Sequence, residues 1–132
     1  MSDREQAVRD TLRDYVTACN EGSAEAYMAT LTADAVSCPP GQPPVQGREA
    51  IGTWVKDGFF DVFDVDFAAD FDRIIVADDE VLAPGRFSLD LKPKAGGEAT
   101  TLTGTFFNIF REDSPGSWKY AWAVWNWQQP FG

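Results

Sequence analysis

The stretch that most restricts the fold of this chain reads Gly41-Gln42-Pro43-Pro44-Val45-Gln46-Gly47-Arg48-Glu49-Ala50-Ile51. Proline lacks the amide donor that helices and central strands need, and it restricts the residue before it. Because Pro39 and Pro40 come just before this stretch, residues 38–44 are predicted to form a rigid loop. The loop leads into a third helix, from about Arg48 to Gly58, whose apolar residues recur at helical spacing.

Two further helices are predicted upstream of this loop. In the first, apolar residues recur at helical spacing until Asn20-Glu21-Gly22 ends the helix. These residues are Val8, Leu12, Tyr15, Val16 and Cys19. Ser23 is expected to cap a short second helix that ends near Ala33-Asp34. Tyr15 is therefore predicted to lie on the buried face of the first helix.

From Asp61 onward the apolar pattern changes from helical spacing to strict alternation. One face of the first strand carries Phe63, Val65, Phe67, Ala69 and Phe71, and the other carries Asp64, Asp66, Asp70 and Asp72. Further strands are expected at residues 74–76, 86–91, 100–110 and 118–127. Both faces of the last two strands carry apolar residues, so both should be covered. Three helices followed by strands predict an α+β fold with the helices on one side of an antiparallel sheet.

Composition and charge limit the functions that this chain can have. With 132 residues and 44% hydrophobic content, residues 1–132 are expected to form a single domain. A net charge of −10 disfavours nucleic acid and an anionic membrane surface as partners. The chain has no histidine, the residue most often used as a general base and metal ligand, so no metal or other cofactor is expected. A cytoplasmic location is predicted, because the first residues are unlike a signal peptide and the two cysteines fit no disulfide framework.

These features resemble the ketosteroid-isomerase branch of the NTF2-like superfamily and its SnoaL-like relatives. The resemblance rests on Tyr15, on Ala33-Asp34 and above all on the stretch Gly41–Ile51. It implies a cone-shaped fold in which three N-terminal helices pack on a strongly curved antiparallel β-sheet, with a dry interior that receives a small, mostly apolar cyclic molecule. It also implies a homodimer through the outer sheet face, with one of Trp122 or Trp125 facing the cone and the other facing the partner. The alternative is that both tryptophans fill the core of a monomer.

The resemblance fails at two of the three groups that the family's isomerase chemistry uses. That chemistry needs an aspartate base and an oxyanion hole made by a tyrosine and a protonated aspartic acid. Tyr15 matches the tyrosine, whereas the base falls at Cys38 or Pro39 and the aspartic acid falls at Phe106. Val55 also replaces a tyrosine that orders the first one in the family. Loss of a positioned base costs about 10² to 10⁴ in rate, so steroid isomerisation by the known mechanism is not expected.

Tyr15 and Asn108 are the candidate catalytic residues. Strand alternation puts Asn108 on the same face as Phe106, where its amide would orient a carbonyl or hydroxyl group in an otherwise apolar cavity. Alternatively, Tyr15 is a core tyrosine whose hydroxyl bonds a backbone carbonyl. A slip of one residue in register would exchange Phe106 for Phe107 and Trp125 for Trp122. The candidate substrate-binding residues are Trp54, Phe59, Phe87, Leu89, Phe106, Trp125 and Cys38.

Three functions remain open at the level of sequence. The first is an enzyme of the isomerase, cyclase or dehydratase type that acts on a small cyclic or polyketide-like molecule without a metal or redox cofactor. The second is a binding or carrier domain for an apolar ligand, and the third is a homodimerisation module whose interior is filled by its own side chains. A cavity of about 300 Å³ or more with a polar end at Tyr15 would retain the first two.

Overall fold

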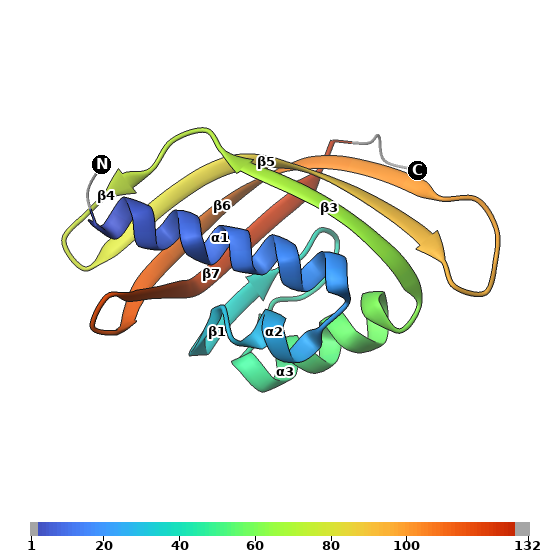
Figure 1. The fold of residues 1–132 in the computed structure, drawn as a ribbon, viewed down its shortest axis with the longest axis horizontal. Coiled ribbons are helices and arrows are strands. Elements are labelled where there is room, and N and C mark those ends of the chain that lie inside the picture. The colour runs from blue at the N-terminus through green and yellow to red at the C-terminus, as the bar shows by residue number, and fades with distance from the viewer. Residues whose placement is uncertain (1–2, 129–132) are drawn as a thin grey trace.

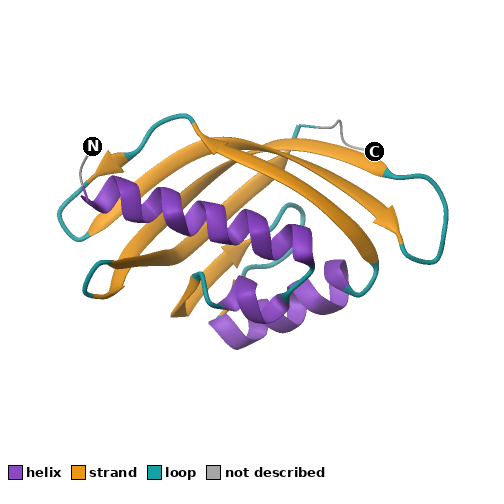
Figure 2. Ribbon diagram, in the orientation of Figure 1, coloured by secondary structure: helices purple, strands orange, loops and turns teal. Residues whose placement is uncertain are grey.

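The computed structural model describes residues 3–128. Its helices all lie on one face of a single sheet (Figure 2), and α1 crosses that face beneath the long strands (Figure 1). The helical elements are α1 (Asp3–Glu21), α2 (Ala24–Met28), α3 (Arg48–Val55) and the π-helical turn η1 (Lys56–Phe60). The strands are β1 (Leu31–Cys38), β2 (Val45–Gln46), β3 (Phe63–Phe71), β4 (Ile75–Val76), β5 (Glu80–Pro93), β6 (Thr100–Ser114) and β7 (Ser117–Trp127). The predicted α+β fold is confirmed.

The sheet is mixed, which corrects the prediction of a wholly antiparallel sheet. Its strand order is β2-β1-β7-β6-β5-β3, with β4 paired to β5. β1 runs parallel to β7, and every other pair is antiparallel. The sequence prediction missed β1 because its burial does not alternate cleanly along residues 31–38. Ala33 and Asp34 consequently lie in a strand and not at the end of a helix.

Local sequence signals account for the helix boundaries. The Ser23 hydroxyl accepts a hydrogen bond from the Ala26 amide at 3.1 Å, which confirms the predicted cap of α2. Gly47 has a φ of 94°, a value that favours glycine, and α3 begins at the next residue. The third helix is shorter than predicted, because its regular α-helical part ends at Val55 and the π-helical turn follows. None of the helices in residues 3–128 is long and apolar enough to cross a membrane.

Strand β3 has the predicted alternation of buried and exposed residues. Phe63, Val65, Phe67, Ala69 and Phe71 are buried or half-buried, while Asp64, Asp66 and Asp70 are exposed. On β5, which pairs with β3, and on β6 beyond it, glycine and phenylalanine face each other twice: Phe87 pairs with Gly104, and Gly85 pairs with Phe106. In both pairs the ring lies against the glycine opposite, where a side chain would collide with it. The glycines therefore let both rings lie close to the sheet.

A bulge in β7 brings two distant residues to the same face of the sheet. Phe110 of β6 pairs with Tyr120, but the adjacent Ile109 pairs with Trp122, so Ala121 is an extra residue in the ladder. Because successive side chains in a strand alternate, residues five apart normally lie on opposite faces. Because Ala121 is inserted between them, the alternation of faces is shifted by one position after Tyr120. Tyr120 and Trp125 consequently both point toward the helices.

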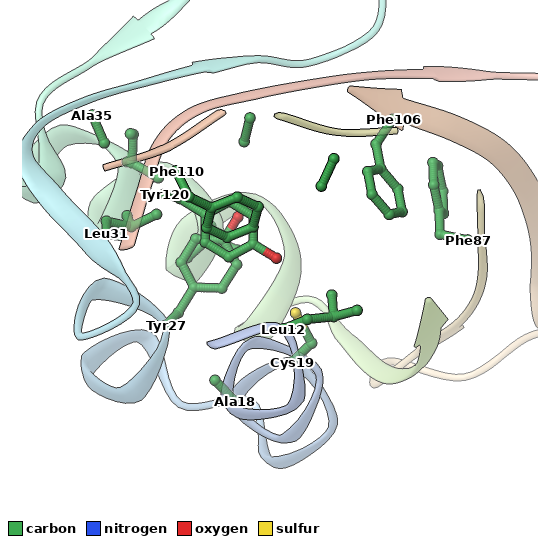
Figure 3. Close-up of a cluster of buried hydrophobic side chains, with 14 of the residues drawn as sticks. Leu12, Ala18, Cys19, Tyr27, Leu31, Ala35, Phe87, Phe106, Phe110 and Tyr120 are labelled. Atoms are coloured by element: carbon green, nitrogen blue, oxygen red, sulfur yellow. The ribbon is translucent and has the colours of Figure 1, made fainter. Parts of the chain in front are cut away.

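The core lies between the sheet and the helices. Figure 3 shows side chains from α1, α2 and β1 meeting aromatic rings from β6 and β7. Phe110 and Tyr120 lie with ring centroids 4.4 Å apart at its centre, and both are almost fully buried. Such packed aromatic pairs add to the stabilisation that comes from burial alone. A cavity opens beside this core, and Tyr120 belongs to its lining.

Candidate functional site

A cavity opens between the sheet and the helices, and nearly all of its wall is apolar. The space between the atoms is about 660 Å³ when the solvent at its open mouth is included, and the part that can hold the centres of water-sized molecules is about 70 Å³. The smaller value sets the ligand size, because it excludes the clefts between atoms and is several times the minimum for one water. The lining residues are Leu12, Tyr15, Cys19, Tyr27, Trp54, Val55, Phe59, Phe60, Val65, Phe67, Ala69, Phe87, Leu89, Phe106, Asn108, Tyr120, Ala123 and Trp125.

The polar end of the cavity is a cluster of the chain's three tyrosines. The hydroxyls of Tyr15 and Tyr27 share a hydrogen bond of 2.7 Å, and their ring centroids are 4.7 Å apart. The ring centroids of Tyr15 and Tyr120 are 4.8 Å apart. The Tyr27 and Tyr120 side chains are labelled in Figure 3. Tyr15 is therefore ordered by a phenol from α2, although Val55 removes the tyrosine that orders its counterpart in the family.

Every ionisable group in the cavity wall is neutral near pH 7. Burial raises the pKa of Tyr15 and Tyr120 well above the usual value for a phenol, and it raises the pKa of Tyr27 as well. Burial also raises the pKa of the Cys19 thiol. No aspartate, glutamate, lysine or arginine is among the residues that line this cavity in residues 3–128. The site therefore offers neutral hydrogen-bond donors and no strong base.

Asn108 and Trp125 supply the remaining polar atoms in the wall. Asn108 is buried, and no hydrogen bond of its side chain occurs within residues 3–128. The Trp125 indole N–H and the Tyr120 hydroxyl are also buried, and neither has a hydrogen-bond partner in the described part of the chain. Buried polar groups in native proteins are nearly always paired with protein, water or ligand. The Tyr120 hydroxyl and the Trp125 N–H have almost no accessible surface, so the Asn108 amide is the one of these three groups that is open to a molecule in the cavity.

The proline-rich loop reaches the cavity through Gln42. Its side-chain carbonyl accepts a hydrogen bond of 3.0 Å from the indole N–H of Trp54. Trp54 lines the cavity, where its ring meets Phe59 and Trp125 edge-on at centroid distances of 5.2 and 6.2 Å. Gly41 has a φ of 68°, the left-handed conformation that glycine adopts readily. The motif thus positions one wall of the cavity.

The structure places eight of the nine predicted site residues around this cavity. They are Tyr15, Trp54, Phe59, Phe87, Leu89, Phe106, Asn108 and Trp125. Phe107 and Trp122, which a register slip would have brought inward, are 42% and 37% exposed. The catalytic and binding roles of the eight lining residues stay predictions, because a position in the wall does not establish a role. Sequence reasoning missed Tyr27 and Tyr120, although the small number of tyrosines in the chain was a usable signal.

Cys38 is the predicted site residue that lies elsewhere. It is the last residue of β1 and pairs with Val124, which is 39% exposed on the outer face of the sheet. Partners in a ladder share a face, so the thiol points away from the cavity. Asp34 is exposed and accepts a hydrogen bond from the Thr32 hydroxyl at 3.0 Å. Within residues 3–128, no cluster of three or more Asp, Glu, Cys or His side chains could hold a metal ion.

The fold and this apolar cavity define a domain of the NTF2-like superfamily. The sequence profile of the SnoaL-like domain matches residues 12–115. The chain therefore belongs to the SnoaL-like domain family, as the resemblance predicted. No curated protein matches the sequence significantly.

Several solved structures share the fold at low sequence identity. A ketosteroid isomerase-like protein from Erwinia carotovora atroseptica is 23% identical, with 95% of this chain and 96% of that chain covered and a TM-score of 0.83. A candidate dehydratase of the NTF2-like family from Streptomyces avermitilis is 16% identical over 97% of both chains, with a TM-score of 0.83. A candidate scytalone dehydratase from Novosphingobium aromaticivorans is 16% identical, with 96% of this chain and 85% of that chain covered and a TM-score of 0.85. These similarities establish the fold alone.

Proposed function

We propose that this protein binds a small, mostly apolar ring molecule in the cavity between α1 and the sheet. The observation that carries the proposal is a wall of aromatic and aliphatic side chains with a few neutral polar groups, among them the Tyr15 and Tyr27 hydroxyls at one end. Apolar pockets with a few convergent polar groups are the usual form of small-molecule sites. The space for water-sized molecules, about 70 Å³, is smaller than the roughly 300 Å³ of a typical ligand pocket, so binding of a ring requires lining side chains to move. A module whose interior is filled by its own side chains is the alternative.

A ring molecule with a carbonyl or hydroxyl oxygen suits the tyrosine end of this cavity. The Tyr15 and Tyr27 hydroxyls share one hydrogen between them, which leaves the second hydroxyl hydrogen free to bond a ligand oxygen. Because burial keeps these phenols protonated, they remain donors throughout the physiological range. The described lining holds no charged side chain, which disfavours an ionised ligand because its desolvation would not be compensated.

Catalysis of an isomerisation, cyclisation or dehydration is a second candidate function. It is favoured by neutral donors aimed at a ligand oxygen, because such donors stabilise charge that develops on an enolate oxygen. Structural neighbours described as isomerase-like and as candidate dehydratases agree with this class of reaction. The proton would have to move to water or to a group of the substrate itself, since the described lining residues include no carboxylate.

Ligand titration followed by a turnover assay separates binding from catalysis. Tryptophan fluorescence can follow binding, because Trp54 and Trp125 both line the cavity. Exchange of α-protons in deuterated water, measured by NMR on bound cyclic ketones, reports enolisation of any ketone that the cavity accepts. If Tyr15→Phe abolishes exchange while affinity persists, the protein is an enzyme. Affinity without any exchange in the unmodified protein favours a binding or carrier domain, and failure of all ring compounds to bind would overturn the proposal.

We also propose that a second copy of the chain covers the outer face of the sheet. Phe107 pairs with Val124 and Ile109 pairs with Trp122, so three large apolar side chains that are 37–42% exposed lie on two rungs of β6 and β7 that are two residues apart and share a face. Contiguous apolar patches on a sheet face are typical of interfaces. Phe107→Glu should convert a dimer to a monomer in sedimentation, whereas Val62→Glu, at an exposed valine outside the sheet, should not. A monomeric unmodified protein would overturn this proposal.

A further inference from the structure

Strand β3 forms one edge of the sheet in residues 3–128, because it pairs with β5 on one side and is the last strand in the order. The Asp72 amide and the Val62 carbonyl, next to the two ends of β3, form hydrogen bonds of 2.8 and 2.9 Å to the β5 side. Hydrogen bonding in an antiparallel strand alternates from residue to residue. Val65, Phe67 and Ala69 therefore turn their backbone N–H and C=O groups away from β5. Such a row of backbone groups is a template on which another strand can pair.

The side chain of Asn20, in the last turn of α1, occupies the centre of this edge. Its amide donates a hydrogen bond of 3.0 Å to the Phe67 carbonyl, and its side-chain carbonyl accepts one of 2.6 Å from the Phe67 amide. Two reciprocal bonds to the N–H and C=O of one residue are what a neighbouring antiparallel strand forms. Asn20 therefore takes the place of one residue of a missing strand.

Aspartates on the outer face of β3 oppose the addition of a second β3 strand. If the edges of two copies paired antiparallel with Phe67 opposite Phe67, Asp64 would lie opposite Asp70. A shift of two residues places Asp66 opposite Asp66 in one direction and opposite Asp70 in the other. Shifts of one residue are excluded, because only every second residue turns its backbone groups to this edge. Like charges directly opposite each other destabilise a strand pair. Asp66 already pairs with Asp90 on β5, so its charge is not balanced across that rung.

We propose that Asn20 and the aspartates of β3 together protect this edge from pairing with a second copy of the chain. Asn20 satisfies the backbone groups of Phe67, the residue on which a symmetric pair of edges would centre. The aspartates oppose the registers around that centre. Edge protection requires neither the ring ligand nor the outer-face dimer proposed above, and it goes beyond both.

Hydrogen exchange measured by NMR tests the role of Asn20 in the native fold. Asn20→Ala removes both bonds, so the Phe67 amide should exchange up to about tenfold faster. The Val65 and Ala69 amides, which point to the free edge, should exchange rapidly with or without the substitution. Gln6→Ala removes another exposed side-chain hydrogen bond of the same helix and should leave exchange at Phe67 unchanged. Equal exchange at Phe67 in Asn20→Ala and in the unmodified protein would overturn the inference.

Sedimentation velocity tests whether the edge assembles once its protection is removed. Phe107→Glu is present in every variant, so that the outer face of the sheet does not contribute. In this background, Asn20→Ala combined with Asp66→Asn and Asp70→Asn should raise the association constant at least about tenfold over the parent. Circular dichroism confirms that the variants are folded, and the two aspartate substitutions alone, which keep Asn20, test the charges if the combined variant does not fold.

Exchange at the edge distinguishes strand pairing from unspecific aggregation. In the assembled protein the Val65 and Ala69 amides should become protected, because they would donate to the added strand. A folded combined variant that associates no more than its parent would overturn the inference. Assembly without protection of these two amides would overturn it as well. Either result leaves the proposed ring binding and outer-face dimer standing.

Discussion

Gly104→Ala should destabilise the fold although alanine is a better strand residue than glycine. A Cβ at position 104 would lie 2.7 and 2.8 Å from two ring carbons of Phe87, and it would overlap the backbone carbonyl oxygen of Asn126. The carbonyl belongs to the adjoining strand and cannot rotate away, so the ring and the strand must both shift. Overpacking of this kind costs about 1–3 kcal/mol, and the lower entropy of the unfolded alanine chain offsets about 0.4–1 kcal/mol of it.

The expected net loss in the free energy of unfolding is therefore about 1–2 kcal/mol. At about 2.1 cal/mol/K of unfolding entropy per residue, the chain of 132 residues should lose roughly 4 to 7 °C in Tm. Thermal and denaturant unfolding followed by circular dichroism measure both quantities. Affinity for ring ligands should fall as well, because a displaced Phe87 ring changes the shape of the cavity that it lines.

Gly58→Ala is the matched control, because a Cβ there has no heavy atom within 4 Å and the residue does not have a positive φ. It should stabilise the protein by about 0.5–1 kcal/mol through backbone entropy. Gly85→Ala should behave like Gly104→Ala, since its Cβ would meet the Phe106 ring and the carbonyl oxygen of Asp70. If Gly104→Ala proves as stable as Gly58→Ala, the glycines do not hold the rings in the way described.

Three further predictions concern the cavity and its surroundings. All three tyrosines have raised pKa values, so the native protein should show no tyrosinate absorbance until it unfolds. Below pH 10 these phenols are neutral in both the folded and the unfolded state, and their contribution to the free energy of unfolding is complete. Above pH 10 only the unfolded state loses protons, so the free energy of unfolding should fall by up to about 1.4 kcal/mol per pH unit for each phenol. Tyrosinate absorbance that rises while the circular dichroism stays native would contradict this. Gln42→Leu removes the hydrogen bond to the Trp54 indole and should weaken ring binding severalfold while Tm changes by only a few degrees; Gln46→Leu, at an exposed position nearby, is the control and should match the unmodified protein in both measurements. Asn108→Leu should keep or raise Tm, because it removes a buried amide without a partner in the described residues, yet it should lower affinity for oxygen-bearing ligands; a large loss of Tm would instead mean that the amide supports the fold.

Regular patterns in the sequence were sufficient to predict most of the fold. The helical spacing around Tyr15 and the strict alternation from Phe63 to Phe71 each bury one side of an element, so the pattern follows directly from packing. The inward placement of Phe106 and Asn108 followed from counting along a strand that is regular in that region. The family resemblance then supplied the arrangement of the elements, which no pattern in a single sequence specifies.

The errors at β1, Cys38 and Tyr120 have a common cause: each depends on how a strand pairs with another strand of the sheet. Strand β1 exists because β7 lies beside it, and nothing within residues 31–38 reveals that neighbour. Cys38 was assigned to the cavity because the family's catalytic base aligns at Cys38 or Pro39, in what was expected to be a loop; Cys38 is instead the last residue of β1. Tyr120 was not assigned to the site because its separation from Trp125 places the two on opposite faces of a regular strand. Long-range register is the property that local sequence specifies least.

The extra residue at position 121 divides β7 into two halves. In the first half the even-numbered side chains face the helices, and in the second half the odd-numbered ones do. A scan of polar substitutions along this strand should find even-numbered positions intolerant up to Tyr120 and odd-numbered positions intolerant from Ala123 onward. Deleting Ala121 would bring the whole strand into one phase, and either the tyrosine cluster or the indole would then turn to the outer face. The choice of ligand in this domain thus depends on the number of residues in a strand as much as on their identity, and relatives with the same side chains but a different count should differ in what they bind.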